Sequence, residues 1–511
     1  MGRTIKLGTE HLSAQDVAEI ARGDAAMALG VEARAAIAAS HAALDRLAGS
    51  GMAIYGVSTG LGAAADTRVS PGDAVIQQRI PLARSVGVGR HARRDEVRAI
   101  MAVRLARLAV GRSGASLGTV EALVRMLEHR VHPVVPMTGS VGEADLAPLA
   151  HIASVLIGYG EAELDGTLLS GAEALRRAGL TPPALGAKDG LALVSSNAAS
   201  VGVGALAVVD ARRALGGLLA AAALSFEGYR ANLSPLWPNA VALRPVPGLA
   251  AVAEAMLGAC AGGDLARPNG VRSNGARRLQ DPLSFRCLGQ VHGAAVSALA
   301  AALDAIELEL NSSDDNPAIL ADDALSLPNA NFDATHLALA FEGLGQALAR
   351  VAAAAGERIM KLMSPAASEL PRFLAPVQDG RNGFATVQKT VSALVAEIQH
   401  KALPMPVALL PVADRVEDYG TMALGIVEKT AEIVERVRLL AAIELMVAAQ
   451  ACDLRGGVTL GQGTRTVHAA VRAVVAPLGD DRQLSPDIAA LDGLVASGAF
   501  DVPFALPAGR P

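Results

Sequence analysis

The sequence is poor in aromatic residues, in cysteine and in runs of like charge. Aromatic residues make up 3% of its 511 residues, while Ala, Leu, Val and Gly are abundant. Ala and Leu are strong helix formers, and small side chains let helices pack closely. Cys260, Cys287 and Cys452 are scattered without CxxC spacing, which argues against a disulfide framework and a zinc site. A net charge of −5 without a long basic run argues against nucleic acid or an anionic membrane as a partner.

Neither a secretory signal nor a transmembrane helix is expected. The first residues lack an apolar segment, and the cysteines fit a reducing compartment, so we expect a cytoplasmic protein. Residues 190–209 carry no charge and are long enough to span a bilayer. They nevertheless contain Ser195, Ser196 and Asn197, which indicates the buried start of a helix in a soluble core.

Long periodic segments between Pro and Gly breaks predict an all-α protein. We expect an N-terminal helical, loop-rich domain over residues 1–190 and a long-helix bundle with a C-terminal helical region over 191–511. The long helices are expected near 195–225, 249–261, 284–311, 332–361, 384–401 and 416–452.

A glycine-rich loop, Tyr55–Gly62, has the sequence Tyr-Gly-Val-Ser-Thr-Gly-Leu-Gly. It resembles the loop Tyr-Gly-Val-Asn-Thr-Gly-Phe-Gly of the histidine/phenylalanine ammonia-lyase family, in which the tyrosine removes the β-proton of the substrate. The resemblance implies that role for Tyr55. Taken alone, the loop is better explained as a glycine-rich turn with an anchoring tyrosine.

A second segment, Gly139–His151, matches the family except at its centre. The family has Gly-Ser-Val-Gly-Ala-Ser-Gly-Asp-Leu-Ala-Pro-Leu-Ala-His, whose Ala-Ser-Gly cyclises and dehydrates into the electrophile methylidene-imidazolone (MIO). Here Glu143 and Ala144 replace these three residues, and Ser140 lies outside the cyclising position. We therefore expect no MIO cofactor, and we expect Glu143 to contact the substrate.

Further motifs follow in the family's order. In Gln280–Gly293, Arg286 matches the arginine that holds the substrate carboxylate, a task that suits its planar guanidinium, while Leu283 replaces a catalytic tyrosine. Asn311–Pro317 and Asn329–Phe332 match other family segments, and Phe332 is expected to line the pocket.

Three positions bear on the choice of substrate. Glu417, in Arg-Val-Glu-Asp-Tyr, matches the residue that faces the substrate imidazole in histidine ammonia-lyases; in isolation it is also explained as a capping acid of a helix. Arg84 replaces a histidine that helps to select the substrate ring, and Ser195 replaces an active-site asparagine.

Lys389 stands out in the helix expected over 384–401. It lies opposite the apolar face and follows Gln388, which matches a family glutamine, whereas family members have an apolar residue at the lysine position. The lysine is explained either as a solvated side chain or as a residue facing a cavity. On the second interpretation it is a catalytic residue and Gln388 a substrate contact.

Together these segments cover roughly residues 10–455, and the resemblance implies the long-helix bundle of the histidine ammonia-lyase and fumarase/aspartase type. It also implies a homotetramer with shared active sites, no metal and a small-molecule substrate. Tyr55, Lys389 and Glu417 are the expected catalytic residues. The expected substrate contacts are Arg286, Arg84, Glu143, Ser195, Phe332 and Gln388.

The expected absence of MIO determines which leaving group we expect. Ammonia is a poor leaving group without covalent activation, whereas trimethylamine leaves as a neutral amine. With Glu143 near the cation, Glu417 near the ring and Lys389 near a ring sulfur, the residues predict elimination of trimethylamine from ergothioneine, as in the family branch that acts without MIO. The alternatives are an ammonia-lyase acting on histidine or another aromatic amino acid, and a non-catalytic relative that binds an amino acid.

Overall fold

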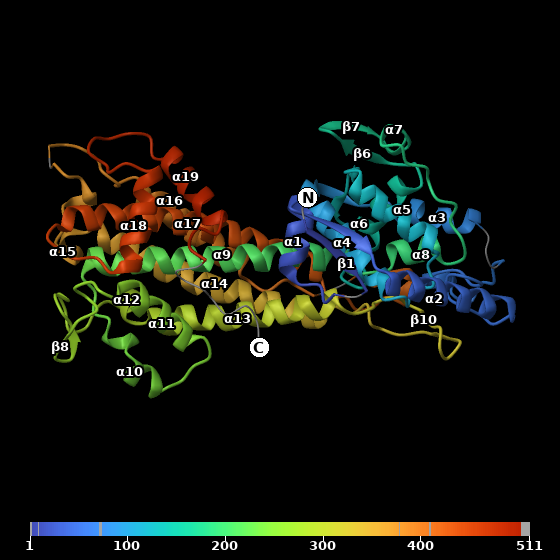
Figure 1. Cartoon of the computed structure of the whole chain (residues 1–511), viewed down its shortest axis with the longest axis horizontal. Helices are drawn as coiled ribbons and strands as arrows, with labels where there is room; N and C mark the ends of the chain where they lie inside the picture. Colours follow the sequence, from blue (N-terminus) through green and yellow to red (C-terminus); the bar gives the residue numbers. More distant parts are fainter. Residues whose placement is uncertain (1–2, 9, 71–73, 378, 408–409, 502–511) are drawn as a thin grey trace. The chain divides into compact units, whose positions relative to one another are not determined.

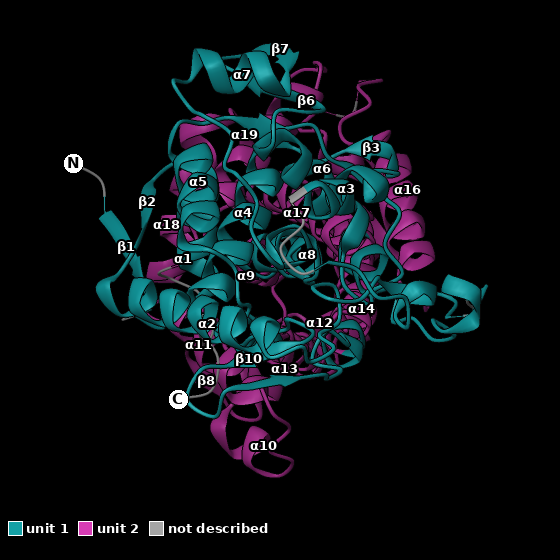
Figure 2. Ribbon diagram, turned by 90° about the vertical axis from the view of Figure 1, so that its right-hand side faces the viewer, with its two compact units in different colours: residues 1–209, 303–339, 405–428 teal, residues 210–302, 340–404, 429–511 magenta. Residues whose placement is uncertain are grey.

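In a computed structural model of the chain, the described residues are 3–8, 10–70, 74–377, 379–407 and 410–501. Helices dominate these ranges, and the strands in them form five small sheets of two or three strands, so the all-α prediction is confirmed (Figure 1). The chain divides into two compact units (Figure 2). Unit 1 comprises residues 1–209, 303–339 and 405–428; unit 2 comprises 210–302, 340–404 and 429–511.

Unit 1 contains short helices and all but one of the five small sheets found in the described ranges. Its helices are α1 (Ala14–Arg22), α2 (Val31–Gly49), α3 (Ala74–Arg84), α4 (Arg94–Ala109), α5 (Leu117–Glu128), α6 (Leu146–Leu156), α7 (Gly171–Arg177) and α8 (Asp189–Val194). Its strands are β1 (Arg3–Leu7), β2 (Ala25–Leu29), β3 (Val88–His91), β4 (His132–Pro133), β5 (Pro136–Thr138), β6 (Glu161–Leu164), β7 (Thr167–Ser170), β10 (Ala318–Leu320) and β11 (Leu325–Leu327). β1 and β2 pair in parallel, and the remaining sheets are antiparallel.

The first helix begins where its capping residue predicts. The Ser13 hydroxyl accepts a hydrogen bond from Asp16 N at 3.2 Å, and the Asp16 carboxylate accepts one from Ser13 N at 2.9 Å, which forms a capping box. α1 packs on α4, and α3 packs on both α6 and α8. Arg84 at the end of α3 and Leu146 at the start of α6 both line the candidate site.

Unit 2 contains the longer parts of four long helices and several shorter helices of its own. Those within it are α10 (Pro238–Ala242), α11 (Leu249–Cys260), α12 (Leu283–Arg286), α15 (Pro365–Ser368), α16 (Val387–Lys401), α18 (Gln462–Val474) and α19 (Ser485–Ala496), with the strand pair β8 (Pro268–Asn269) and β9 (Arg272–Ser273). The unit boundaries fall inside four further helices: α9 (Ala198–Tyr229), α13 (Leu288–Leu310), α14 (Thr335–Leu362) and α17 (Ala423–Arg455). The sequence predicted two domains that meet between residues 190 and 191. Each compact unit instead combines three separate ranges of the chain, so the predicted domain boundary stays a prediction.

Small residues let α9 lie close to its neighbours. A Cβ at Gly202 would lie 2.8 Å from Ile100 N in α4, and one at Gly228 would lie 2.8 Å from the Cβ of Ala451 in α17. The helical stretch Asp189–Tyr229 is long and apolar enough to cross a membrane, as are α13 and α14, but its apolar window is 100% buried inside the protein. The prediction of a buried helix start at residues 190–209 is therefore confirmed.

The helix expected from residue 416 begins later. α17 starts at Ala423, and a short 3-10 turn, Ala413–Arg415, precedes it. Met422 has φ +56°, and its N–H donates to Val141 O at 2.8 Å. Because a residue with positive φ interrupts the helix and is held by another segment, residues 416–422 form a loop over the candidate site.

Candidate active site

Unit 1 contains a cavity of about 660 Å³ whose lining residues all belong to this unit. Ligand pockets commonly enclose roughly 300–1,000 Å³, so this one suits a small molecule. It brings together six of the nine site residues predicted from the sequence: Tyr55, Arg84, Glu143, Ser195, Phe332 and Glu417. These residues come from segments far apart in the chain, which meet at the N-terminal regions of α6 and α9.

The glycine-rich loop holds the phenol of Tyr55 in the cavity. The backbone N–H of Gly62 donates to Tyr55 Oη at 2.9 Å. Gly56 has φ +71°, and a Cβ there would lie 2.5 Å from Leu191 Cδ2, so only glycine fits. A backbone donor to the phenolic oxygen stabilises negative charge on it, as a base at this position requires.

The segment that carries Glu143 is held by the loop before α17. The hydroxyl of Thr421 donates to Gly142 O at 2.9 Å, and a Cβ at Gly142 would lie only 2.0 Å from that hydroxyl oxygen. Ala144 follows with φ +67°, a conformation that costs energy for a residue with a side chain. Ser140 donates to the Asp145 carboxylate at 2.7 Å and so has a structural partner.

The carboxyl of Glu143 is half-buried and faces other acids. Burial, with the nearby charge of Asp333 as the next cause, raises the pKa of Glu143 to about 7, and the charge of Glu417 acts in the same direction. A hydrogen bond from the backbone of Thr421 opposes this shift. Glu143 Oε1 has no hydrogen-bond partner among the described residues. A carboxyl with this pKa can donate or accept a proton near neutral pH.

Arg84 supplies positive charge in the cavity. Its guanidinium lies at the end of α3, where Nη1 donates to Ile80 O at 3.3 Å. Burial lowers its pKa, while the neighbouring Tyr55 and Glu417 act in the opposite direction. The arginine therefore lies within electrostatic range of both the phenol and Glu417.

Glu417 lies in the loop, not in a helix. Its backbone pairs with Val412 as an isolated antiparallel bridge, with Glu417 O accepting from Val412 N at 3.0 Å. Because α17 begins at Ala423, Glu417 is outside its first turn and the helix-capping interpretation is wrong. The side chain lines the cavity together with Tyr419.

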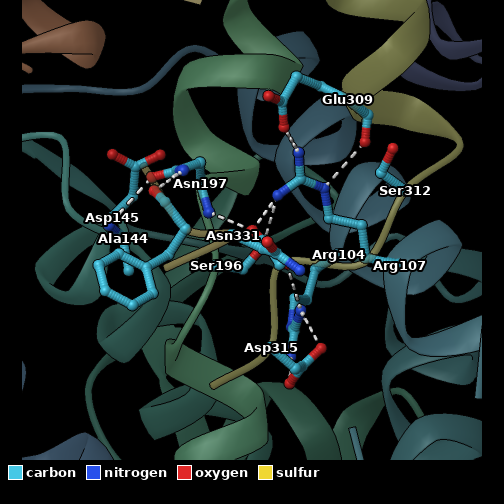
Figure 3. Close-up of polar contacts among 12 residues, drawn as sticks. Arg104, Arg107, Ala144, Asp145, Ser196, Asn197, Glu309, Ser312, Asp315 and Asn331 are labelled. Atoms are coloured by element: carbon cyan, nitrogen blue, oxygen red, sulfur yellow. Dashed lines mark hydrogen bonds and ion pairs between the residues drawn. The ribbon is translucent and has the colours of Figure 1, made fainter. Parts of the chain in front are cut away.

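A buried network behind the cavity orders the segment that carries Glu143 (Figure 3). Asn197 accepts from Ala144 N at 3.0 Å through Oδ1, and its amide nitrogen donates to Phe332 O. Asp314 accepts from Asn197 N and from the Ser196 hydroxyl, both at 2.7 Å, and pairs with Arg107. These hydrogen bonds limit the movement of Asn197 and so of Ala144, which it holds.

Three predicted site residues lie in unit 2 and do not line this cavity. Arg286 is partly exposed and donates to the side-chain oxygen of Gln280. Lys389 is exposed in α16, and Gln388 beside it is intermediate in exposure. Their roles at the site stay predictions, and the solvated-lysine interpretation of Lys389 remains open.

The sequence analysis missed Asp333, Asn197 and Tyr419. Asp333 directly follows the matched Phe332, and Tyr419 ends the matched motif around Glu417, so their place in the motifs was a usable signal. Asn197 had no such signal, because its role depends on contacts with distant segments. Within the described ranges, no group of three or more His, Cys, Asp or Glu side chains is placed to hold a metal ion.

Comparison with known proteins places the whole chain. The aromatic amino acid lyase family model matches residues 12–473. Histidine ammonia-lyase of Anaeromyxobacter sp. (strain K) is 38% identical, over 98% of this chain and 100% of that protein. Among solved structures, ergothionase of Treponema denticola has a TM-score of 0.89 at 30% identity, covering 97% of this chain and 99% of that one. Histidine ammonia-lyase of Trypanosoma cruzi has a TM-score of 0.90 at 28% identity, covering 99% and 96%.

These matches correct the function expected from the sequence. Curated relatives 34–38% identical over nearly the whole chain are histidine ammonia-lyases. They favour the ammonia-lyase alternative, and elimination of trimethylamine from ergothioneine is wrong as the main interpretation.

The expected fold is confirmed by the same comparisons, since the solved relatives share the helical fold of histidine ammonia-lyase over almost the whole chain. The family model and the curated relatives agree on the class of reaction. The chain therefore belongs to the aromatic amino acid lyase family and is a carbon–nitrogen lyase.

Proposed function

We propose that this protein eliminates ammonia from L-histidine or a closely related amino acid that carries an imidazole ring. The observation that carries the proposal is the cavity in which Tyr55, Glu143 and Glu417 lie together, in a chain whose full-length relatives are histidine ammonia-lyases. A base, an acid and a ring contact around one small cavity are the groups that such an elimination requires.

Tyr55 acts as the base. Its phenolate oxygen, which accepts a hydrogen bond from Gly62 N, takes the proton from the β-carbon. The electron pair of that C–H bond forms the double bond between the α- and β-carbons. The bond between the α-carbon and nitrogen then breaks, and its electron pair leaves on the nitrogen.

Glu143 completes the departure of the amine. Its carboxyl, with a pKa of about 7, donates a proton to the neutral amino group as the carbon–nitrogen bond breaks, so that the nitrogen leaves as ammonia. Tyr55 ends protonated and Glu143 ends as a carboxylate. Proton exchange through water restores both groups, so the step needs no other reactant.

The residues present do not fit the family's electrophile. Cyclisation needs Ala-Ser-Gly, whereas Glu143 and Ala144 alone join Gly142 to Asp145, and the nearby Ser140 donates to Asp145. The proposal therefore includes the absence of MIO, and no step above uses it. Because covalent activation is missing, we expect turnover to be slower than in relatives that form the electrophile.

The remaining contacts orient the substrate. Glu417 accepts a hydrogen bond from the imidazole N–H, and Arg84 and Ser195 line the cavity near the ring and the carboxylate. Arg286, Gln388 and Lys389 are proposed to complete the site in a homotetramer with shared active sites, where Arg286 holds the substrate carboxylate. We propose a cytoplasmic location because the three cysteines are free.

An assay of both products tests the proposal. Purified protein is incubated with L-histidine while the absorbance of urocanate and the released ammonia are followed. Tyr55→Phe should lower kcat by about 10²- to 10⁴-fold through loss of the base. Tyr159→Phe, which changes an exposed tyrosine outside the cavity, is the matched control and should leave kcat unchanged.

Two results would overturn the proposal. Binding of histidine without any ammonia release would favour a non-catalytic relative. If the protein releases trimethylamine from ergothioneine and no ammonia from histidine, similarity to histidine ammonia-lyases does not predict its substrate.

A further inference from the structure

A second carboxyl lies beside Glu143. The backbones of Glu143 and Asp333 pair as an isolated antiparallel bridge, which brings the two residues together although they are far apart in the sequence. Their side chains come close enough to share a hydrogen bond. Two neighbouring carboxyls repel each other when both are ionised, which favours a proton on one of them.

The hydrogen bonds to Asp333 decide which of the two holds that proton. Asp333 Oδ1 accepts from Thr335 N at 3.0 Å, and Oδ2 accepts from the Thr335 hydroxyl at 3.1 Å. That hydroxyl also lies 2.8 Å from Tyr419 Oη. Since the single hydroxyl proton of Thr335 goes to Asp333, Tyr419 is the donor in the last contact. Each oxygen of Asp333 therefore accepts a hydrogen bond from Thr335.

Glu143 has less support for negative charge. Its Oε1 has no partner among the described residues, and the backbone of Thr421 is the donor to its carboxyl. Burial and the charge of Asp333 are the two largest causes that raise the pKa of Glu143. The charged or titratable groups that face or line the cavity beside it are Asp333, Glu417, Asp418, Arg84, Tyr55 and Tyr419.

We propose that Asp333 is a positioning residue that keeps a proton on Glu143, through the hydrogen-bond chain from Tyr419 by way of Thr335. Asp333 does not touch the substrate. It acts through Glu143, and the proton that Glu143 holds is the one that moves to the amine nitrogen when the carbon–nitrogen bond breaks. Only that last step rests on the proposed function; the pairing of the two carboxyls does not.

Infrared difference spectroscopy of the ligand-free full-length protein tests the pairing directly. The carbonyl band of a protonated carboxyl is followed against pH, and Glu143→Gln identifies the band that belongs to Glu143. We expect a midpoint near pH 7 in the wild type and a midpoint lower by about one pH unit or more in Asp333→Asn. Asp323→Asn removes an exposed acid that does not line the cavity and should leave the midpoint unchanged.

A second variant keeps the test possible if Asp333→Asn does not fold. Asp333→Ser removes the charge with a smaller side chain and should lower the midpoint in the same direction. An unchanged midpoint in either folded variant, judged by circular dichroism, would overturn the inference. A shifted midpoint in a protein that releases no ammonia from histidine would instead retain the carboxyl pair and reject the proposed function.

The kinetic profile supplies the remaining readout. Loss of the proton on Glu143 should appear as the basic limb of kcat/KM for L-histidine, and Asp333→Asn should move that limb to lower pH by the same amount as the infrared midpoint. A loss of activity at every pH with no movement of the limb would indicate a structural role for Asp333 and contradict the inference.

Discussion

The side-chain oxygen of Asn197 accepts a hydrogen bond of 3.0 Å from the backbone N–H of Ala144, and so holds the residue next to Glu143 at φ +67°. Asn197 is fully buried, and its amide nitrogen donates to Phe332 O, in a second segment that lines the cavity. One asparagine thus joins two walls of the active site. The position of Glu143 depends on this asparagine as much as on its own segment.

Replacement of Asn197 tests that dependence. Asn197→Ala leaves the buried N–H of Ala144 and the partly buried carbonyl of Phe332 without this partner, which should lower the free energy of unfolding by roughly 1–3 kcal/mol for the buried group and by less for the other. We also expect a lower kcat, because Glu143 is no longer held. Urea unfolding and steady-state kinetics measure the two effects. Asn269→Ala, at an exposed position in β8, should change neither.

A pair of glycine replacements separates a steric clash from backbone strain. Gly142 and Gly166 have φ values of +89° and +80°, but a Cβ would meet Thr421 Oγ1 at 2.0 Å only at Gly142, and nothing within 4 Å at Gly166. Gly166→Ala should therefore cost about 1 kcal/mol of strain alone. Gly142→Ala should cost more and should also reduce kcat. Equal losses of stability in thermal unfolding would contradict the close packing of Gly142 on Thr421.

The pKa of Glu143 predicts how stability depends on pH. Between its ordinary value of 4.5 and about 7, the folded state retains a proton on Glu143 that the unfolded state has lost. Because the folded state then binds more protons, this group makes stability fall as pH rises through that range. Relative to Glu143→Gln, the wild type should lose unfolding free energy from about pH 5 to pH 7 and no more above it. Parallel stability curves for the two proteins would contradict the raised pKa.

The buried ion pair of unit 2 should contribute far more to stability than an exposed one. Arg358 Nε lies 2.6 Å from Glu444 Oε1, and both side chains are fully buried. Glu444→Gln leaves a buried guanidinium without its counter-charge and should cost roughly 3–5 kcal/mol. Glu397→Gln breaks the Arg436 pair, which is also 2.6 Å long but lies at the surface, and should cost about 0–1 kcal/mol. Chemical denaturation of both variants measures the difference, and similar losses would refute it.

The helices could be predicted because their signals are local. The capping box at Ser13 and the Pro and Gly breaks act over a few residues, so the predicted and observed helices agree closely. The start of α17 was wrong because a distant hydrogen bond, from Met422 N to Val141 O, stops the helix before Ala423. No pattern within residues 416–423 records that contact.

The site could be predicted only in part, for the same reason. Motif order singled out Tyr55, Glu143 and Glu417, which line one cavity in the structure, and their roles there stay predictions. It did not reveal Asp333, whose effect on Glu143 arises from a backbone bridge between distant segments.

The replacement of Ala-Ser-Gly by Glu143 and Ala144 could be recognised from the sequence alone, because formation of MIO depends on which residues are present. The raised pKa of Glu143 could not be predicted from the sequence, because burial and a neighbouring charge exist only after the chain has folded. The sequence by itself therefore determined the helical architecture, the family and the identity of six of the groups that line the pocket. The tertiary structure alone decided which of those groups carries a proton, since that depends on distances and solvent exclusion that no local pattern encodes.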